Sequence, residues 1–171
     1  AGATYVARTI DRESKHMQAM ISRSYGHKGT SFLEIYQNCN IFNDGAFGPM
    51  TGKESKADSV LWLENGQPMV FGKEKNRGIR LDGNTPMIVE IGDKWSLDDV
   101  LVHNESDYVI ASFLSNLTYQ SDFPDPIGVL YAIDSPTYEE LMLNQISDAI
   151  GKKGSTSVQD ILNAGDTWVV E

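Results

Sequence analysis

The stretch "SFLEIYQNCNIFNDGAF" at residues 31–47 decides the fold that the sequence predicts. Its first seven residues form a mostly apolar run between turn signals, typical of a strand buried on both faces of a parallel sheet. An apolar segment at residues 2–8 and a helix predicted over residues 14–25 come before it, which gives one strand–helix–strand unit. Such units bind ligands at the carboxyl ends of their strands. Cys39 directly follows the second strand and is therefore expected at a ligand-binding edge.

Cys39 has two possible roles. It is the one cysteine of the chain, so it cannot form an internal disulfide, and a lone cysteine is commonly a small buried apolar residue. Amide side chains that can donate hydrogen bonds surround it, as expected around a thiolate ligand of iron; they belong to Gln37, Asn38, Asn40 and Asn43. One thiolate cannot hold a cluster. If Cys39 is a ligand, the others must lie outside these residues.

The composition limits the classes of partner and compartment. With 24 acidic and 14 basic residues the net charge is -10, which argues against a nonspecific nucleic-acid surface. No apolar run approaches the roughly 20 residues of a membrane span, and no secretory signal is recognisable at the N-terminus. We therefore expect no nucleic acid, no membrane and a cytoplasmic location.

The rest of the chain predicts a mixed α+β region. Residues 48–59 are polar and contain glycine, as in a linker. Asn65-Gly66 between apolar runs predicts a hairpin over residues 61–72, and a second β segment follows at residues 78–92. A helix is predicted at residues 106–117 and a buried strand at 127–133. Ser135-Pro136, a cap followed by proline, predicts a helix at 137–150, and a joint at 151–157, a helical turn and a short terminal strand follow it.

No complete catalytic set is recognisable, so the catalytic residues stay unknown. His16, His27 and His103 are scattered and lack a partner at a metal-ligand spacing, which predicts surface or capping roles. The nucleophile elbow, the phosphate-binding loop and the zinc-protease motif are absent from the sequence.

Several motifs together resemble a known family. They are "GATYVAR" (residues 2–8), "HKG" (27–29), "QNCNIFNDGAF" (37–47), "GQPMVFG" (66–72), "VLVH" (100–103) and "PIGVLYAIDSPTYEELM" (126–142). The chain resembles the β subunit of 2-oxoacid:ferredoxin oxidoreductases, most closely the 2-oxoglutarate type. The resemblance covers nearly the whole chain and fades after about residue 151, and its most specific motif is centred on Cys39.

The resemblance implies an α/β fold, the partial doubly wound fold that binds thiamine diphosphate. Residues 1–47 would be the C-terminal part of that domain and residues 48–171 the mixed α+β extension of the β subunit. Cys39 matches the fourth ligand of a [4Fe–4S] cluster. In the family the other three ligands, and the Gly-Asp-Gly segment that holds Mg²⁺ and the diphosphate, lie upstream. The chain is thus expected to be a C-terminal portion of the subunit, with the strand at residues 4–7 at an exposed edge prone to self-association.

The implied activity is oxidative decarboxylation of a 2-oxo acid, with 2-oxoglutarate the first choice, to its acyl-CoA. Electrons would pass through thiamine diphosphate and the [4Fe–4S] cluster to ferredoxin. The implied partners are the α subunit, ferredoxin, coenzyme A and the 2-oxo acid, and the chain alone is expected to be inactive. The alternative is a noncatalytic interaction or structural module that contacts the partner subunit.

Overall fold

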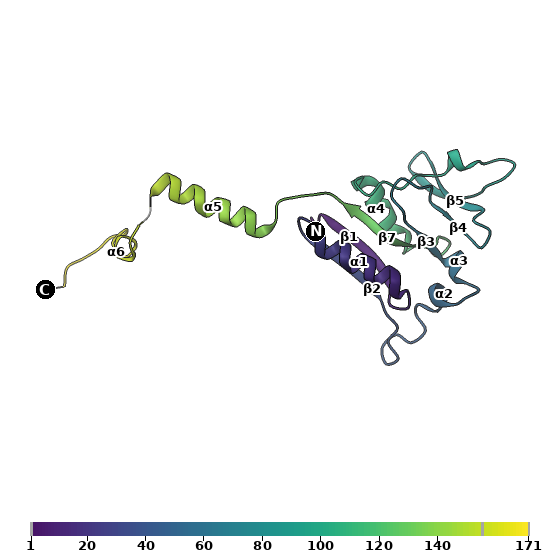
Figure 1. Cartoon of the computed structure of the whole chain (residues 1–171), viewed down its shortest axis with the longest axis horizontal. Helices are drawn as coiled ribbons and strands as arrows, with labels where there is room; N and C mark the ends of the chain where they lie inside the picture. Colours follow the sequence, from purple (N-terminus) through teal and green to yellow (C-terminus); the bar gives the residue numbers. More distant parts are fainter. Residues whose placement is uncertain (1, 155, 171) are drawn as a thin grey trace. The chain divides into compact units, whose positions relative to one another are not determined.

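The computed structural model describes residues 2–154 and 156–170 (Figure 1). Contacts group the residues into two compact units, one ending at Ser135 and the other beginning at Pro136. In the first unit the elements in chain order are β1 (Tyr5–Ile10), α1 (Ser14–Gly26), β2 (Ser31–Tyr36), α2 (Gly48–Thr51), α3 (Lys56–Ser59), β3 (Val60–Trp62), β4 (Val70–Phe71), β5 (Arg77–Asp82), β6 (Thr85–Glu90), the 3-10 helix η1 (Leu97–Asp99), α4 (Tyr108–Leu117) and β7 (Asp125–Ala132). The domain boundary expected between residues 47 and 48 stays a prediction.

The first sheet has the strand order β2-β1-β7-β3 and is mixed. β1 and β2 are parallel and in register over their full length, from Tyr5 opposite Ser31 to Ile10 opposite Tyr36. β7 is antiparallel to β1, and β3 is parallel to β7. The strand–helix–strand unit that the sequence predicts is confirmed, within a mixed α/β fold of parallel and antiparallel strands.

The outer strands of this sheet are β2 and β3, which corrects two expectations. The strand at residues 4–7 is not an edge, because β1 lies between β2 and β7. β2 is not buried on both faces either, since Phe32 and Ile35 are exposed. The strand that pairs with the other edge of β1 is β7, which lies more than 100 residues later in the chain, so the local sequence gives no indication of it.

The second sheet is antiparallel, with the order β4-β5-β6. The hairpin predicted around Asn65-Gly66 is wrong. The turn forms, with Gly66 at a φ of 76°, but β3 pairs with β7 and β4 pairs with β5. The second β segment predicted at residues 78–92 is confirmed, and it forms a hairpin of β5 and β6 whose turn places Gly83 at a φ of 60°.

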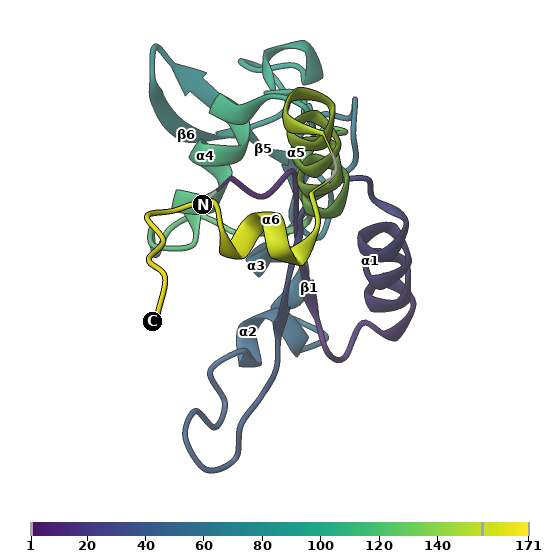
Figure 2. The same ribbon diagram turned by 90° about the vertical axis from the view of Figure 1, so that its left-hand side faces the viewer.

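Two helices cover opposite faces of the first sheet (Figure 2). α1 packs Met20 against Tyr5 and Ala7 of β1. α4 buries Leu114 and Leu117 in the largest hydrophobic cluster, which it shares with the second sheet. α4 confirms the helix predicted at residues 106–117. Its cap is Asp107, whose carboxylate accepts hydrogen bonds from the backbone N–H groups of Val109 and Ile110.

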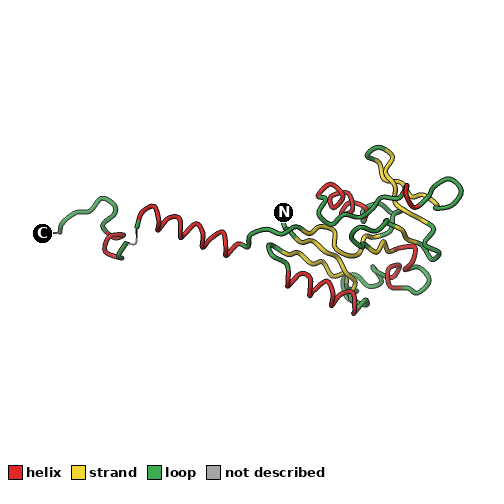
Figure 3. The backbone as a smooth tube through the Cα atoms, turned by 45° about the horizontal axis from the view of Figure 1, so that its top comes forward, coloured by secondary structure: helices red, strands yellow, loops and turns green. Residues whose placement is uncertain are grey.

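The second unit contains α5 (Tyr138–Lys153) and α6 (Val158–Leu162), drawn as red helices in Figure 3. The helix predicted at residues 137–150 is confirmed as α5. Its cap is Thr137, in a capping box with Glu140, and not the predicted Ser135. α5 continues to Lys153, so it covers the first residues of the expected joint. The expected terminal strand is not found among described residues 163–170. Of the helices in the described ranges, none combines the length and apolar character needed to cross a membrane.

Candidate metal-ligand site

Cys39 lies in a loop, residues 37–47, that leaves the carboxyl end of β2. Its backbone carbonyl accepts a hydrogen bond of 2.9 Å from the Asn43 N–H, which closes one tight turn. The side chain is partly exposed rather than enclosed in the core. The structure therefore places the thiol at the sheet edge that the sequence predicts, where it can reach a ligand.

Backbone N–H groups surround the sulfur. The Phe42 N–H donates to Sγ at 3.5 Å. The N–H groups of Phe42, Ile41 and Asn43 together hold the pKa of Cys39 below its ordinary value. A thiolate is the form of cysteine that binds metal or attacks an electrophile, so the loop favours the reactive form. The sequence pointed to amide side chains as the donors, but the donors found around the sulfur are backbone groups.

The side chain of Asn38 joins the two ends of the Cys39 loop. Its Nδ2 donates to Asn40 Oδ1 at 2.8 Å and to Asp44 Oδ1 at 3.0 Å. Its Oδ1 accepts from the Gly45 N–H at 2.8 Å. The amide that the sequence placed next to the cysteine therefore orders the loop instead of contacting the sulfur.

An aromatic stack fixes the base of the loop to the sheet. The rings of Tyr36 and Phe47 lie parallel, with centroids 4.6 Å apart. A buried cluster formed by Ile10, Met50, Val60 and Ile127 packs beside the carboxyl ends of β1 and β2. Both ends of the loop are thus anchored, which limits how far Cys39 can move relative to β2.

A partly buried group of polar side chains lies on the α4 face of the same sheet. Arg8 forms an ion pair with Glu34 at 2.6 Å, donates to the Thr118 hydroxyl at 2.7 Å, and lies 5.1 Å from the centre of the Tyr36 ring. Asp125, at the start of β7, has a buried Oδ1 without a hydrogen-bond partner in the described structure. Burial raises the pKa of Asp125, while the Thr118 hydroxyl and Arg8 act in the opposite direction.

The sequence gave little sign of this group, because its members come from distant segments. The signal that could have found Asp125 is its place between Pro124 and Pro126, directly before a buried apolar run. An acidic residue at the start of a buried strand is uncommon unless a partner is near.

Of the three histidines, His103 contradicts the predicted surface or capping role, whereas His27 is the C-terminal cap residue of α1. His103 is only 1% exposed, so its predicted surface role is wrong. Its Nε2 is 2.7 Å from the Val129 carbonyl, and burial lowers its pKa. His16 bonds the hydroxyl of Thr9 at 2.8 Å. Among the described residues, none of the three histidines makes a hydrogen bond or ring contact with Cys39.

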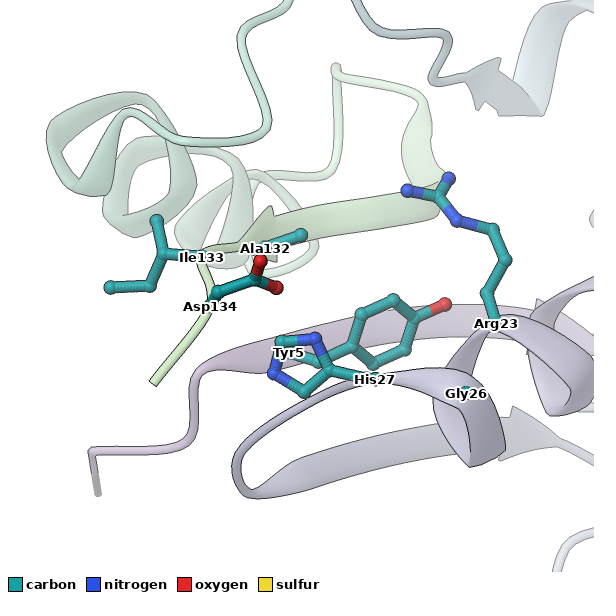
Figure 4. A pocket seen from close by; sticks show the side chains of 7 residues that line it. All are labelled: Tyr5, Arg23, Gly26, His27, Ala132, Ile133 and Asp134. Atoms are coloured by element: carbon teal, nitrogen blue, oxygen red, sulfur yellow. The ribbon is translucent and has the colours of Figure 1, made fainter. Parts of the chain in front are cut away.

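A polar cavity of about 480 Å³ lies at the opposite, amino end of β1, lined by Tyr5, Arg23, His27 and Asp134 (Figure 4). The Arg23 guanidinium faces Glu105 with two hydrogen bonds of 3.1 and 2.7 Å. Its charge is already compensated, so it is poorly suited to hold an anion. The cavity contains none of the residues that the sequence proposed as ligands.

Within the described ranges, no three or more His, Cys, Asp or Glu side chains lie close enough to hold a metal ion. Cys39 fits one ligand position of a metal cluster, because its thiol is partly exposed and its pKa is held below the ordinary value. The described residues do not provide the other ligands of a cluster. We identify no diphosphate-binding site among them.

Comparison with known proteins tests the resemblance indicated by the motifs. No family model matches the chain. The 2-oxoglutarate oxidoreductase subunit KorB of Mycobacterium tuberculosis is 29% identical over 175 residues, covering 100% of this chain and 46% of KorB. The resemblance is confirmed. This chain is similar along its whole length to a 2-oxoglutarate oxidoreductase subunit.

A solved structure agrees at the level of the fold. The chain matches the 2-oxoglutarate:ferredoxin oxidoreductase of Magnetococcus marinus, solved with 2-oxoglutarate, coenzyme A and succinyl-CoA bound, with a TM-score of 0.55 and 19% identity. The match covers 97% of this chain and 42% of that chain. The chain thus spans less than half the length of both proteins that it matches.

Proposed function

We propose that this chain is the C-terminal portion of a 2-oxoacid:ferredoxin oxidoreductase β subunit, in which Cys39 is one ligand of a [4Fe–4S] cluster. The similarity to KorB over the full chain carries the proposal. Support from the geometry comes from the position of Cys39 at the carboxyl end of β2, in a loop that favours the thiolate. The doubly wound thiamine-diphosphate fold would be completed by the rest of the subunit.

The proposed reaction is oxidative decarboxylation of a 2-oxo acid to its acyl-CoA. Bound thiamine diphosphate and Mg²⁺ would supply the electron sink for loss of CO₂, and the cluster would carry electrons to ferredoxin. The task of this chain is narrower: it holds one thiolate at a fixed place and surrounds it with N–H donors. Hydrogen bonds to sulfur are one of the terms that set a cluster's reduction potential.

The proposed substrate is 2-oxoglutarate, because both similar proteins carry that substrate in their names. The proposed partners are the α subunit, ferredoxin and coenzyme A, in the cytoplasm. Catalytic residues are not assigned to this chain.

The test is an anaerobic assay of a complete αβ enzyme that contains this chain. Wild-type enzyme should reduce ferredoxin with 2-oxoglutarate and coenzyme A, and more slowly with pyruvate. The Cys39→Ala and Cys39→Ser variants should lose most ferredoxin reduction, because the electron path is interrupted. Gln37→Ala, a change two residues away at an exposed position, is the matched control and should keep the activity.

Wild-type rates of ferredoxin reduction in both Cys39 variants would rule out the ligand role. Absence of activity with every 2-oxo acid, in an enzyme loaded with its cofactors, would instead favour the second candidate. That candidate is a noncatalytic module that contacts the partner subunit. The observation in its favour is that the described residues hold no complete set of metal ligands.

A further inference from the structure

We infer that Arg8 is a positioning residue for the proposed cluster ligand. It acts through the ring of Tyr36, which stacks on Phe47 at the base of the Cys39 loop. The inference rests on the proposed function, because it concerns the place at which the thiolate is held. It also gives a task to the motif at residues 2–8, which ends at Arg8.

Arg8 is a charged residue in a central strand. It lies in β1, between β2 and β7, and most other side chains of β1 are apolar. Its side chain is 11% exposed and pairs with Glu34, the residue opposite it in β2. Apolar residues in the place of a buried ion pair are often neutral or stabilising. The stability of the sheet is therefore not a sufficient reason for a guanidinium at this position.

The guanidinium holds Tyr36 in two ways. Its carbon lies 5.1 Å from the centre of the Tyr36 ring, where a cation is attracted by the negative face of the ring. Arg8 also donates to the Thr118 hydroxyl at 2.7 Å, and that hydroxyl hydrogen-bonds the Tyr36 side chain. Both the ring and the hydroxyl of Tyr36 are thus connected to one guanidinium, whose planar fork is rigid.

Tyr36 in turn holds the Cys39 loop against the sheet. Tyr36 ends β2 and Phe47 directly precedes α2, so the two rings stand at the start and the end of the loop. They stack with centroids 4.6 Å apart and an angle of 15° between their planes. Among the described residues, the hydrogen bonds of the Asn38 side chain and of the turn at Cys39 connect loop residues only to one another. Those bonds set the internal shape of the loop, whereas the stacked rings set its place on the sheet.

The place of the loop matters for a cluster. A cluster binds only when its thiolates reach their irons together, so each thiolate must be held at a fixed position. Replacing a residue that orients a metal ligand typically costs about 10–100-fold in metal affinity or activity. Arg8 acts on Cys39 through other residues, so we expect an effect at the low end of that range.

The first test measures the position of the loop without iron. Cys39 is the one cysteine of the chain, so a nitroxide attached to it reports where the loop lies. A second nitroxide on Gln18→Cys, an exposed position of α1, provides a distance from the sheet-bound helix to the loop. Pulsed electron paramagnetic resonance on the 171-residue chain gives the distribution of this distance. The distribution should be narrow in the parent chain and broaden in Arg8→Met/Glu34→Gln, a pair of changes that leaves no unpaired carboxylate in the ion pair.

The second test measures how firmly the complete β subunit holds its iron. In anaerobically purified protein, release of iron to EDTA should be about tenfold faster in Arg8→Met/Glu34→Gln than in wild type. Arg8→Lys should lie between the two, because an ammonium keeps the charge beside the ring but cannot bond Glu34 and Thr118 as one fork.

Control variants separate positioning from stability. Met20→Ala removes packing of α1 on the opposite face of the sheet, where Met20 contacts Tyr5 and Ala7. It should lower stability to urea and leave the distance distribution and the iron release unchanged. Because the Arg8 variants could fail to fold, Phe47→Leu breaks the same connection at the other ring and should broaden the distribution. Phe47→Tyr, which keeps a stacked ring, should behave as wild type.

Wild-type distributions and iron release in both the Arg8 double variant and Phe47→Leu would overturn the inference. Equal changes in Met20→Ala would also overturn it, since the effect would then follow stability. The two proposals fail separately. Unchanged distances together with loss of iron in Cys39→Ser would refute the role of Arg8 and leave the ligand in place, whereas broadened distances with full iron in Cys39→Ser would refute the ligand.

Discussion

Replacing Asn38 with alanine should loosen the loop around Cys39. The Asn38 side chain makes three hydrogen bonds that connect Asn40, Asp44 and Gly45. A net hydrogen bond contributes about 0.5–1.5 kcal/mol, and these bonds lie in exposed positions, so the low end applies. The closed loop should lose about 1.5 kcal/mol in total, which lowers its population relative to open forms about tenfold.

Two measurements on the 171-residue chain follow this change. The Gly45 amide, which loses its acceptor, should exchange with solvent about tenfold faster in Asn38→Ala. The pKa of Cys39, read from the pH dependence of alkylation by iodoacetamide, should rise toward its ordinary value, because the N–H donors of the turn leave the sulfur. Gln37→Ala is the matched control and should change neither quantity.

Unchanged exchange at Gly45 together with an unchanged alkylation profile would refute this reasoning. It would mean that the turn from Cys39 to Asn43 is held by its own backbone bond and by the stacked rings of Tyr36 and Phe47. A change in exchange without a change in the pKa of Cys39 would separate the order of the loop from the environment of the sulfur.

Three further predictions concern stability and pH, each measured by urea unfolding. Gly128→Ala should destabilise the chain by about 3 kcal/mol, because Gly128 has a φ of 137° and a Cβ there would lie 2.8 Å from the Leu63 carbonyl oxygen; a loss under about 0.5 kcal/mol would contradict the packing of β3 on β7. Leu114→Ala should cost about 2–5 kcal/mol, since Leu114 is fully buried between α4 and the sheets; a neutral effect would argue against that core. Burial raises the pKa of Asp125, so the folded state binds the Asp125 proton more tightly than the unfolded state does. The contribution of protonated Asp125 to stability is therefore full below the unfolded pKa of about 3.9 and is lost as the pH rises through the folded pKa. Asp125→Asn should flatten this pH dependence of the unfolding free energy, and an unchanged dependence would contradict the buried placement.

The local elements could be predicted from the sequence, but their partners could not. The apolar periodicity at residues 106–117 identified α4, and Ser135-Pro136 marked the start of α5, because helices depend on nearby residues. The residue that caps α5, Thr137, was not the one predicted. The turn at Asn65-Gly66 was also correct. The strands on either side of it found partners elsewhere, β7 for β3 and β5 for β4, since strand pairing depends on residues far apart in the chain.

The candidate site shows the same division. The sequence could predict the position of Cys39, because the apolar run of β2 ends at Tyr36, shortly before it. The donors to its sulfur are set by the turn that the backbone makes after Cys39, and residue types alone do not determine that turn. The partly buried group of Arg8, Glu34, Thr118 and Asp125 joins four separate segments, and no local pattern could place those side chains together.

The most direct test of the central claim is the iron and sulfide content of the complete β subunit, purified anaerobically as wild type, Cys39→Ser and Gln37→Ala. If Cys39 binds the cluster, Cys39→Ser should lose most of the iron and the visible absorption of the cluster, while Gln37→Ala keeps both. Equal iron and sulfide in all three proteins would contradict the claim that this thiol is a cluster ligand.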